Sequence, residues 1–296
     1  MVSVTKRRVN GTIYYYLSHS YREDNKVKVI EKAIGREIPQ DLDSIKEEFI
    51  KEIVNKRWTA RIAVKRNNYV QKLKALPEVI KANQLREFGV RFTHNTNKIE
   101  GSTLTLREVA VAINEPEIPI KKPTKEINEA QCHMIAYEDM INTKLELSMK
   151  MVQKWHKILF SLHPERNNFA GLVRKDQIYI SGSNYVPLQG GIVCEELLDI
   201  LFKWYGENKD IINPVLLACL MHFHFVSIHP FLDGNGRMTR LLMNYILFKK
   251  EYPMFDIPAE IRFSYYNALE KANLKDDEMI FVSWFFKNYL KSVKEL

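Results

Sequence analysis

The feature that most constrains the fold is an apolar stretch, PVLLACLMHFHFV at 214–226, because its hydrophobic side chains surround the whole helix that it would form. A helix without a polar face belongs inside a core, with other helices packed around it. The stretch is too short to cross a bilayer and contains His222 and His224, so we expect no membrane association. A chain of 296 residues is long enough for one large domain or two modest ones.

Helical periodicity extends over most of the chain from residue 78 onward. The exception is GLVRKDQIYISGSNYVPLQG at 171–190, where QIYIS and YVPL flank a GSN turn and predict a β-hairpin. The fold class is therefore mainly α, with one hairpin that can pack on the core or cover a site. The predicted helices lie at about 78–98, 105–114, 124–142, 148–161, 192–206, 212–226, 235–250, 262–272 and 277–294.

The N-terminal quarter differs in composition and charge. Residues 11–36 are dense in Tyr, Val and Ile and predict two or three strands of a β-hairpin, and about 40–75 reads as helix. We expect a small strand and helix unit at 1–77, followed by a core at 78–296. Residues 1–75 contain 17 lysines and arginines against 9 acids, whereas the rest has 27 of each. This basic segment suits nucleic acid or an acidic partner, although a solvated helix face gives the same pattern.

The cysteines indicate a reducing compartment. Cys132, Cys194 and Cys219 are widely spaced and match no CxxC pattern, which favours buried thiols over a disulfide framework or a zinc site. The first residues, MVSVTKRRVNGT, lack the apolar run of a secretory signal. We therefore expect a cytoplasmic protein.

The chemistry of the chain concentrates in SIHPFLDGNGRMTR at 227–240. Pro230 ends the apolar helix, and DGNG opens the next one, since its glycines expose backbone N–H groups and Asp233 or Asn235 can cap. A buried helix N-terminus attracts anions. Arg237 and Arg240 share one face of its first turns, where positive charge opposes the helix dipole unless an anion lies between them.

These residue types together indicate polyphosphate chemistry. Two arginines on an exposed helix start suit a polyphosphate, and Asp233 beside them can hold Mg²⁺ against phosphate oxygens. His229 titrates in the range of a general base near neutral pH. The chain has no P-loop motif and no kinase glycine-rich loop. His222 and His224 face different ways on a helix and are predicted core residues, with a metal-dependent hydrolase around them and His229 as a competing hypothesis.

HPFLDGNGRMTR at 229–240 matches the Fic motif, HPFx(D/E)GNGRxxR, at every fixed position, and the resemblance extends over roughly 78–294. Fic proteins are mostly α-helical, and most transfer AMP from ATP onto a hydroxyl side chain of a target protein. The resemblance implies His229 as the base, Asp233 as the Mg²⁺ ligand and Arg240 as the γ-phosphate contact. Gly234, Asn235, Gly236 and Arg237 would form the phosphate cradle. The related Doc kinases have Lys in place of Gly236, so this glycine favours adenylyl transfer.

Two further segments resemble the same family. The hairpin at 171–190 resembles the Fic flap, which pairs with the backbone of the target as an added strand. Ile180 occupies the flap position near adenine. YYNALEKAN at 265–273 resembles a late family helix, in which Tyr266 and Asn273 would meet the ribose or the adenine. As an alternative, Tyr265 and Tyr266 are core aromatics.

TNKIEG at 96–101 matches the inhibitory motif of Fic proteins, (S/T)xxxE(G/N), with Thr96 and Glu100 at its fixed positions. The resemblance implies an inhibitory helix at about 90–101 whose Glu100 pairs with Arg240 and misaligns ATP. Alternatively, Glu100 is a surface carboxylate, or it orients a water for removing AMP, which would make the protein a de-AMPylase or a bifunctional enzyme. Related proteins are often dimers, so a homodimer stays open. A nucleic-acid-binding regulator that uses the basic N-terminal segment is the hypothesis from another class.

Overall fold

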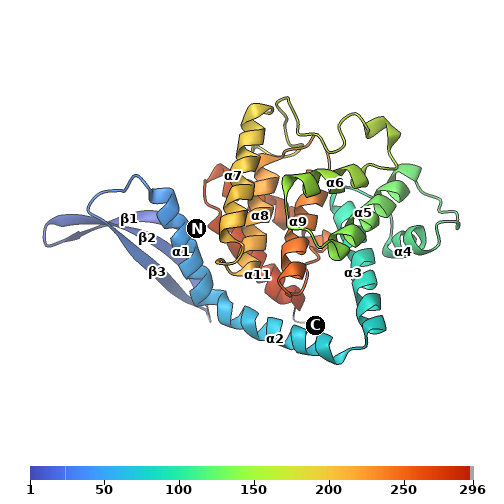
Figure 1. Cartoon of the computed structure of the whole chain (residues 1–296). Coiled ribbons are helices and arrows are strands. Elements are labelled where there is room, and N and C mark those ends of the chain that lie inside the picture. The colour runs from blue at the N-terminus through green and yellow to red at the C-terminus, as the bar shows by residue number, and fades with distance from the viewer. Residues whose placement is uncertain (24, 294–296) are drawn as a thin grey trace.

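The computed structural model describes residues 1–23 and 25–293 and shows a helical body with a small antiparallel sheet at one side (Figure 1). The strands are β1 (Val2–Val9), β2 (Thr12–Glu23) and β3 (Lys26–Gly35). The helices of the N-terminal part and the first half of the body are α1 (Leu42–Val54), η1 (Asn55–Thr59), α2 (Ala60–Ala75), α3 (Glu78–Ile99), α4 (Leu106–Asn114), α5 (Thr124–Asn142), α6 (Met149–Leu159) and η2 (Pro164–Arg166). The second half contains α7 (Ile192–Asn208), α8 (Pro214–Ile228), α9 (Asn235–Lys249), η3 (Ala259–Ile261), α10 (Arg262–Leu274) and α11 (Met279–Ser292).

The three strands form one sheet in the order β1-β2-β3, and the strand prediction was incomplete. β1 begins at Val2, outside the predicted range, because its run of cations hides the apolar alternation of a strand. The turn into β2 has positive φ at Asn10 and Gly11, as a tight two-residue hairpin requires. The inner face of the sheet, which carries Leu17 and Ile30, packs in one hydrophobic cluster with α1.

The helix predicted at 40–75 is present as α1 and α2, joined by the π-helical turn η1. Leu76 leaves the helical conformation, and α3 starts directly after Pro77. The N-terminal unit packs on the body: Trp58 stacks on Phe286 at 4.7 Å, and the backbone N–H of Val2 donates to Asp277. Its buried residues belong to the same hydrophobic cluster as those of the body. The division at 77 stays a prediction.

The apolar stretch forms α8, which lies at the centre of the body as expected (Figure 1). The other helices predicted from residue 78 onward are confirmed within a few residues at each end. His222 and Tyr265 are buried and share a hydrogen bond, so the prediction that these two side chains belong to the core is confirmed. The same prediction is wrong for His224, whose side chain is 40% exposed and pairs with Glu278 at 3.1 Å. Within the described residues, no helix is both long and apolar enough to span a bilayer.

The flap at 171–190 has no β-strand in the structure, which corrects the hairpin prediction. Its chain still reverses direction, through a turn in which the N–H of Ser183 donates to the carbonyl of Ile180. The guanidinium of Arg174 donates to the carbonyls of Asp176 and Leu188 and so bridges the base of the flap. Pro187 has no N–H to donate to a ladder. The flap is therefore held by side chains in place of strand pairing.

Candidate active site

The loop between α8 and α9 has a fixed shape. His229 follows α8 in the left-handed conformation, with φ 54° and ψ 60°, which is uncommon for a residue other than glycine. The Asn235 side chain accepts from the N–H of Phe231 and donates to its carbonyl, at 2.9 and 2.7 Å. Gly234 also has positive φ, at 80°. These constraints hold the imidazole beside the first turn of α9.

His229 is set to accept a proton. Its Nδ1 lies 3.2 Å from the carbonyl of Val226, which can only accept, so the proton is on Nδ1 and the lone pair on Nε2. Burial lowers the pKa of His229 below its ordinary value, although this hydrogen bond opposes the shift. The imidazole is therefore neutral at pH 7 and has the protonation state of a general base.

The start of α9 is a buried cationic site. Arg237 and Arg240 are 3% and 1% exposed, and no acidic residue lies in the first turn. Within the described part of the chain, Nε of Arg237 and Nη1 of Arg240 are buried without a hydrogen-bond partner. Buried donors are rarely left unpaired in proteins. Their position at a helix N-terminus is that of an anion site.

Glu100 and Thr96 hold one of these arginines. Arg240 donates from Nη2 to Glu100 Oε1 at 2.5 Å and from Nε to the Thr96 hydroxyl at 2.6 Å. Gly236 makes the first contact sterically feasible, since a Cβ there would lie 2.2 Å from Glu100 Oε1. Glu100 caps the C-terminus of α3, where the helix dipole disfavours negative charge. The carboxylate and the guanidinium therefore relieve each other's unfavourable position.

Asp233 is ionised but already engaged. Burial alone would raise the pKa of its carboxyl, but Arg237 and Arg166 together hold the pKa below its ordinary value. Arg166 forms a close ion pair with Asp233, and both arginines lie over the ring of Phe160. Arg166 was not among the predicted site residues, because its neighbours in PERNNF carry no pattern that indicates a contact with a loop more than sixty residues away.

Two buried side chains that the sequence analysis also missed support the loop. Arg174 donates from Nε to the carbonyl of His229 at 2.8 Å and from Nη2 to that of Ile228 at 3.2 Å, which ties the flap base to the catalytic loop. His156 accepts from the N–H of Gly171 and contacts the carbonyl of Asp233 at 2.9 Å. Burial lowers the pKa of His156 to about 4. No spacing rule connects these residues to the motif.

The flap tip meets the predicted adenine side of the site at α10. The Asn184 N–H and the Ser183 hydroxyl both donate to Glu270, at 2.6 and 3.3 Å. Tyr266 and Asn273 lie on the same side of α10 as Glu270, since they are four and three residues away. The Tyr266 hydroxyl donates to the carbonyl of Ile99, next to Glu100, whereas the Asn273 amide donates within its own helix. The structure thus brings the turn of Ile180 and the end of α3 to positions about one helical turn apart on one face of α10.

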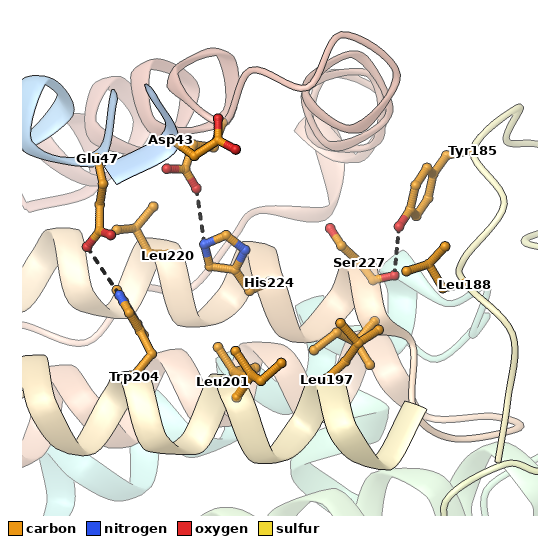
Figure 2. A pocket seen from close by; sticks show the side chains of 13 residues that line it. Asp43, Glu47, Tyr185, Leu188, Leu197, Leu201, Trp204, Leu220, His224 and Ser227 are labelled. Carbon is orange, nitrogen blue, oxygen red and sulfur yellow. Dashed lines mark hydrogen bonds and ion pairs between the residues drawn. The ribbon is translucent and has the colours of Figure 1, made fainter. Parts of the chain in front are cut away.

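A pocket of about 410 Å³ lies between α7, α8 and the flap residues Tyr185 and Leu188 (Figure 2). Its floor is apolar, with Leu197 and Leu201 of α7, and the His224–Glu278 pair lies at its rim. The Tyr185 hydroxyl donates to the carbonyl of Ser227 at 3.0 Å, two residues before His229. In the described residues, no group of three or more His, Cys, Asp and Glu side chains has the arrangement of a metal site.

The site places a neutral histidine next to a helix start at which two buried guanidinium groups have nitrogens without a partner in the described residues, an arrangement that suits phosphate groups. Residues 146–247 match the model of the Fic/DOC family, so this part of the chain resembles a Fic domain. Protein adenylyltransferase fic-1 of Caenorhabditis elegans is 32% identical over 199 residues, which are 65% of this chain and 38% of that relative. The chain thus spans less than half the length of the curated relatives that it resembles.

Solved structures show the same fold. Fic-1 from C. elegans superposes with a TM-score of 0.70 at 24% identity, over 86% of this chain and 74% of that one. A Fic domain containing signaling protein from Bacteroides thetaiotaomicron has a TM-score of 0.69 at 22% identity, over 79% and 93%. The likeness extends beyond the segment that matches the family model and includes most of the helical body.

Proposed function

We propose that the protein is an adenylyltransferase that moves AMP from ATP onto a Ser, Thr or Tyr hydroxyl of a target protein, and also onto itself. The observation that supports this most is the pair of unpartnered guanidinium nitrogens of Arg237 and Arg240, buried at the start of α9. The names of the curated relatives support the same activity. ATP is the substrate whose phosphates would satisfy these donors.

In the proposed reaction, the target's hydroxyl oxygen bonds to the α-phosphorus of ATP, and the bond from that phosphorus to the oxygen bridging the β-phosphate breaks. The hydroxyl proton passes to Nε2 of His229, and pyrophosphate leaves. Arg240 would hold the γ-phosphate, while Arg237 and the backbone of 234–236 would cradle the others. Ile180, Tyr266 and Asn273 would surround the nucleoside, as the resemblance implies.

Asp233 is the proposed ligand of Mg²⁺. Its carboxylate is ionised and half-exposed beside the helix start, and Mg²⁺ prefers such an oxygen donor. The ion would neutralise phosphate charge during transfer. Asp233 pairs with Arg166 and Arg237 in this structure. These guanidinium groups would have to move away from the carboxylate oxygens when Mg²⁺ binds.

The activity is proposed to be restrained by Glu100. Its carboxylate occupies the Arg240 donor that the γ-phosphate would need, so ATP would bind with a misplaced α-phosphate. A displacement of about 1 Å can cost about 10²-fold in rate. De-AMPylation is the second candidate, because the Glu100 side chain is 37% exposed beside the site and could orient a water. Loss of phosphodiester cleavage in Glu100→Gln would distinguish it.

The remaining parts of the proposal concern partners and setting. A target segment would lie along the flap at 171–190, and a homodimer is the assembly that the resemblance implies. Three buried cysteines with free thiols support a reducing, cytoplasmic setting.

Labelled ATP tests the proposed function. The Glu100→Gly protein is expected to label itself much faster than the unmodified chain, and adding His229→Ala is expected to abolish the label. Mass spectrometry of the labelled protein would identify an AMP adduct and its acceptor residue. A Glu100→Gly protein that stays unlabelled would contradict the restraint, and label that persists without His229 would contradict the base.

A further inference from the structure

The outer face of the N-terminal sheet combines tyrosines with arginines. Strand pairing places Arg7 opposite Tyr14, and Thr5 opposite Tyr16, on the same side of the sheet. The Arg7 guanidinium lies over the Tyr16 ring at 5.2 Å, and that of Arg36 lies over Tyr14 at 5.6 Å. Neither ring is needed for the packing of the sheet on the body, because both point away from the inner face.

The inner face accounts for the attachment of the sheet. Leu17 and Ile30 are buried against α1, and Lys32 on the same face pairs with Glu52 of α1 at 2.6 Å. Arg57 lies over the Tyr21 ring at 4.1 Å and contacts His19 at 3.0 Å. The sheet is therefore a rigid platform, and Figure 1 shows it standing out from the helical body with α1 on one side.

The outer face of the platform carries more cations than acids. Strand alternation places Arg7 and Arg22 on this face, whereas five of the eight lysines and arginines in residues 1–36 alternate onto the opposite face. The acid on the outer face of the described strands, Glu31, pairs with Arg7, which retains 55% side-chain exposure, and Arg22 and Arg36 are also exposed. Proteins also place cations on edge strands to prevent the strands from pairing with other chains. That purpose does not require tyrosine rings beneath the guanidinium groups.

We propose that this outer face binds single-stranded nucleic acid, which is a function separate from adenylyl transfer. Tyr14 and Tyr16 are two residues apart on one strand, so their rings are spaced by about 7 Å and can each stack against one base. The guanidinium groups of Arg7 and Arg36, which now cover the rings, turn to the phosphates when bases take their places. Stacking tolerates any base, so the expected binding is sequence-tolerant and dependent on salt.

The full chain is tested by fluorescence anisotropy with fluorescein-labelled oligo-U RNA and oligo-dT DNA of about 15 nucleotides. Binding is expected for both strands at about 50 mM KCl and to weaken steeply by about 200 mM. Preference for one of the two shows whether the 2′-hydroxyl contributes. A duplex of equal length is expected to bind more weakly, because its bases are already stacked.

Matched variants separate stacking from charge. Tyr14→Ala with Tyr16→Ala is expected to weaken binding at least tenfold and leave the salt slope unchanged. Arg7→Gln with Arg36→Gln is expected to lower the slope by about 1.4. Lys56→Gln with Arg61→Gln, which removes the same charge from η1 and α2, is expected to change affinity less than about twofold. Unchanged circular dichroism and auto-AMPylation would show that each variant is folded.

Three results would overturn the proposal. The first is no anisotropy change at low salt with micromolar protein. The second is equal loss of affinity in the sheet pair and in the matched Lys56 and Arg61 pair, which would mean unspecific attraction. The third is that the tyrosine variant binds the single strand as tightly as the unmodified chain does, or that the unmodified chain binds duplex or a polyglutamate peptide as tightly as it binds the single strand. That last result would indicate a general anion surface or an acidic protein partner.

Discussion

Replacing Gly236 with alanine is expected to separate Glu100 from Arg240. The added Cβ would lie 2.2 Å from Glu100 Oε1 and 3.2 Å from Glu100 Cδ. The carboxylate must therefore retreat by roughly 1 Å or more to reach ordinary contact at about 3.5 Å. A hydrogen bond between charged groups contributes about 1.5–3 kcal/mol, so its loss would shift the closed arrangement by about 10- to 150-fold.

The rate of auto-AMPylation with labelled ATP measures this shift. Gly236→Ala is expected to raise the rate of the otherwise unmodified chain, because Arg240 becomes available to the γ-phosphate. In a Glu100→Gly background, the same substitution has no carboxylate to displace and is expected to leave the rate nearly unchanged. The four proteins form a double-mutant cycle, and the coupling between the two positions should account for most of the gain.

Two results would refute this reasoning. If Gly236→Ala lowers the rate by the same factor in both backgrounds, the methyl group disturbs the phosphate site and the contact with Glu100 is irrelevant. If it leaves the rate unchanged in the chain with Glu100, the pair with Arg240 does not limit activity. The matched substitution Gly206→Ala on α7, where a Cβ would meet nothing within 4 Å, controls for a general effect of alanine in a helix.

Further predictions concern pH and the two arginines that the sequence analysis missed. Because burial holds the pKa of His229 below its ordinary value, the rate of the Glu100→Gly protein should persist to lower pH than a histidine of ordinary pKa would allow, and it should fall as the pH passes through the lowered pKa. Burial lowers the pKa of His156 to about 4 and that of His133 to about 3, whereas the pKa of each in the unfolded chain is near 6.5. The protein therefore loses stability as the pH falls below about 6.5, because the unfolded state takes up protons that the folded state does not. The loss should reach about 2 kcal/mol each at pH 5, seen in urea unfolding and reduced in His156→Gln. Arg166→Gln should strengthen Mg²⁺ binding severalfold in calorimetry, since it frees Asp233, and unchanged affinity would argue against competition. Arg174→Lys, which cannot bridge the carbonyls of Leu188 and His229, should speed proteolysis within 171–190 and slow transfer, whereas an unchanged cleavage pattern would mean that the flap is held by other contacts.

The parts that the sequence predicted are those that local patterns encode. The starts of α3 and α9 follow from helical spacing, with Pro77 and the DGNG turn before them. The contact of Glu100 with Arg240 was predictable only because the two motifs resemble a known family, since 140 residues separate them in the chain. The phosphate site at 229–240 followed from residue chemistry, whereas the role of Glu100 was found by motif alone.

The predictions that failed concern features that tertiary contacts determine. QIYIS has the composition of a strand, but side chains occupy carbonyl groups on both arms of the flap. The Gln177 amide donates to the carbonyls of Ile178 and Pro187, and Arg174 donates to those of Asp176 and Leu188, so the flap folds without a ladder. Arg166 and His156 act on Asp233 and its loop across 67 and 77 residues, and neither has a distinctive neighbour in sequence. His224 lies in an apolar run, yet the N-terminus of α11 brings Glu278 to it and leaves the imidazole partly exposed.

The contacts around Arg240 indicate that Glu100, and not Arg240, would move when the proposed inhibitory ion pair opens. Thr96 receives Nε through its hydroxyl and Nη2 through its carbonyl, so two of the guanidinium nitrogens stay anchored when Glu100 leaves. Arg240 is also fully buried, and an unpaired guanidinium in that position is unfavourable. Glu100 is the more exposed partner and sits at the end of α3, where it can turn toward solvent. Release would therefore require the rotation of one carboxylate, and Arg240 would already be positioned for the proposed contact with phosphate.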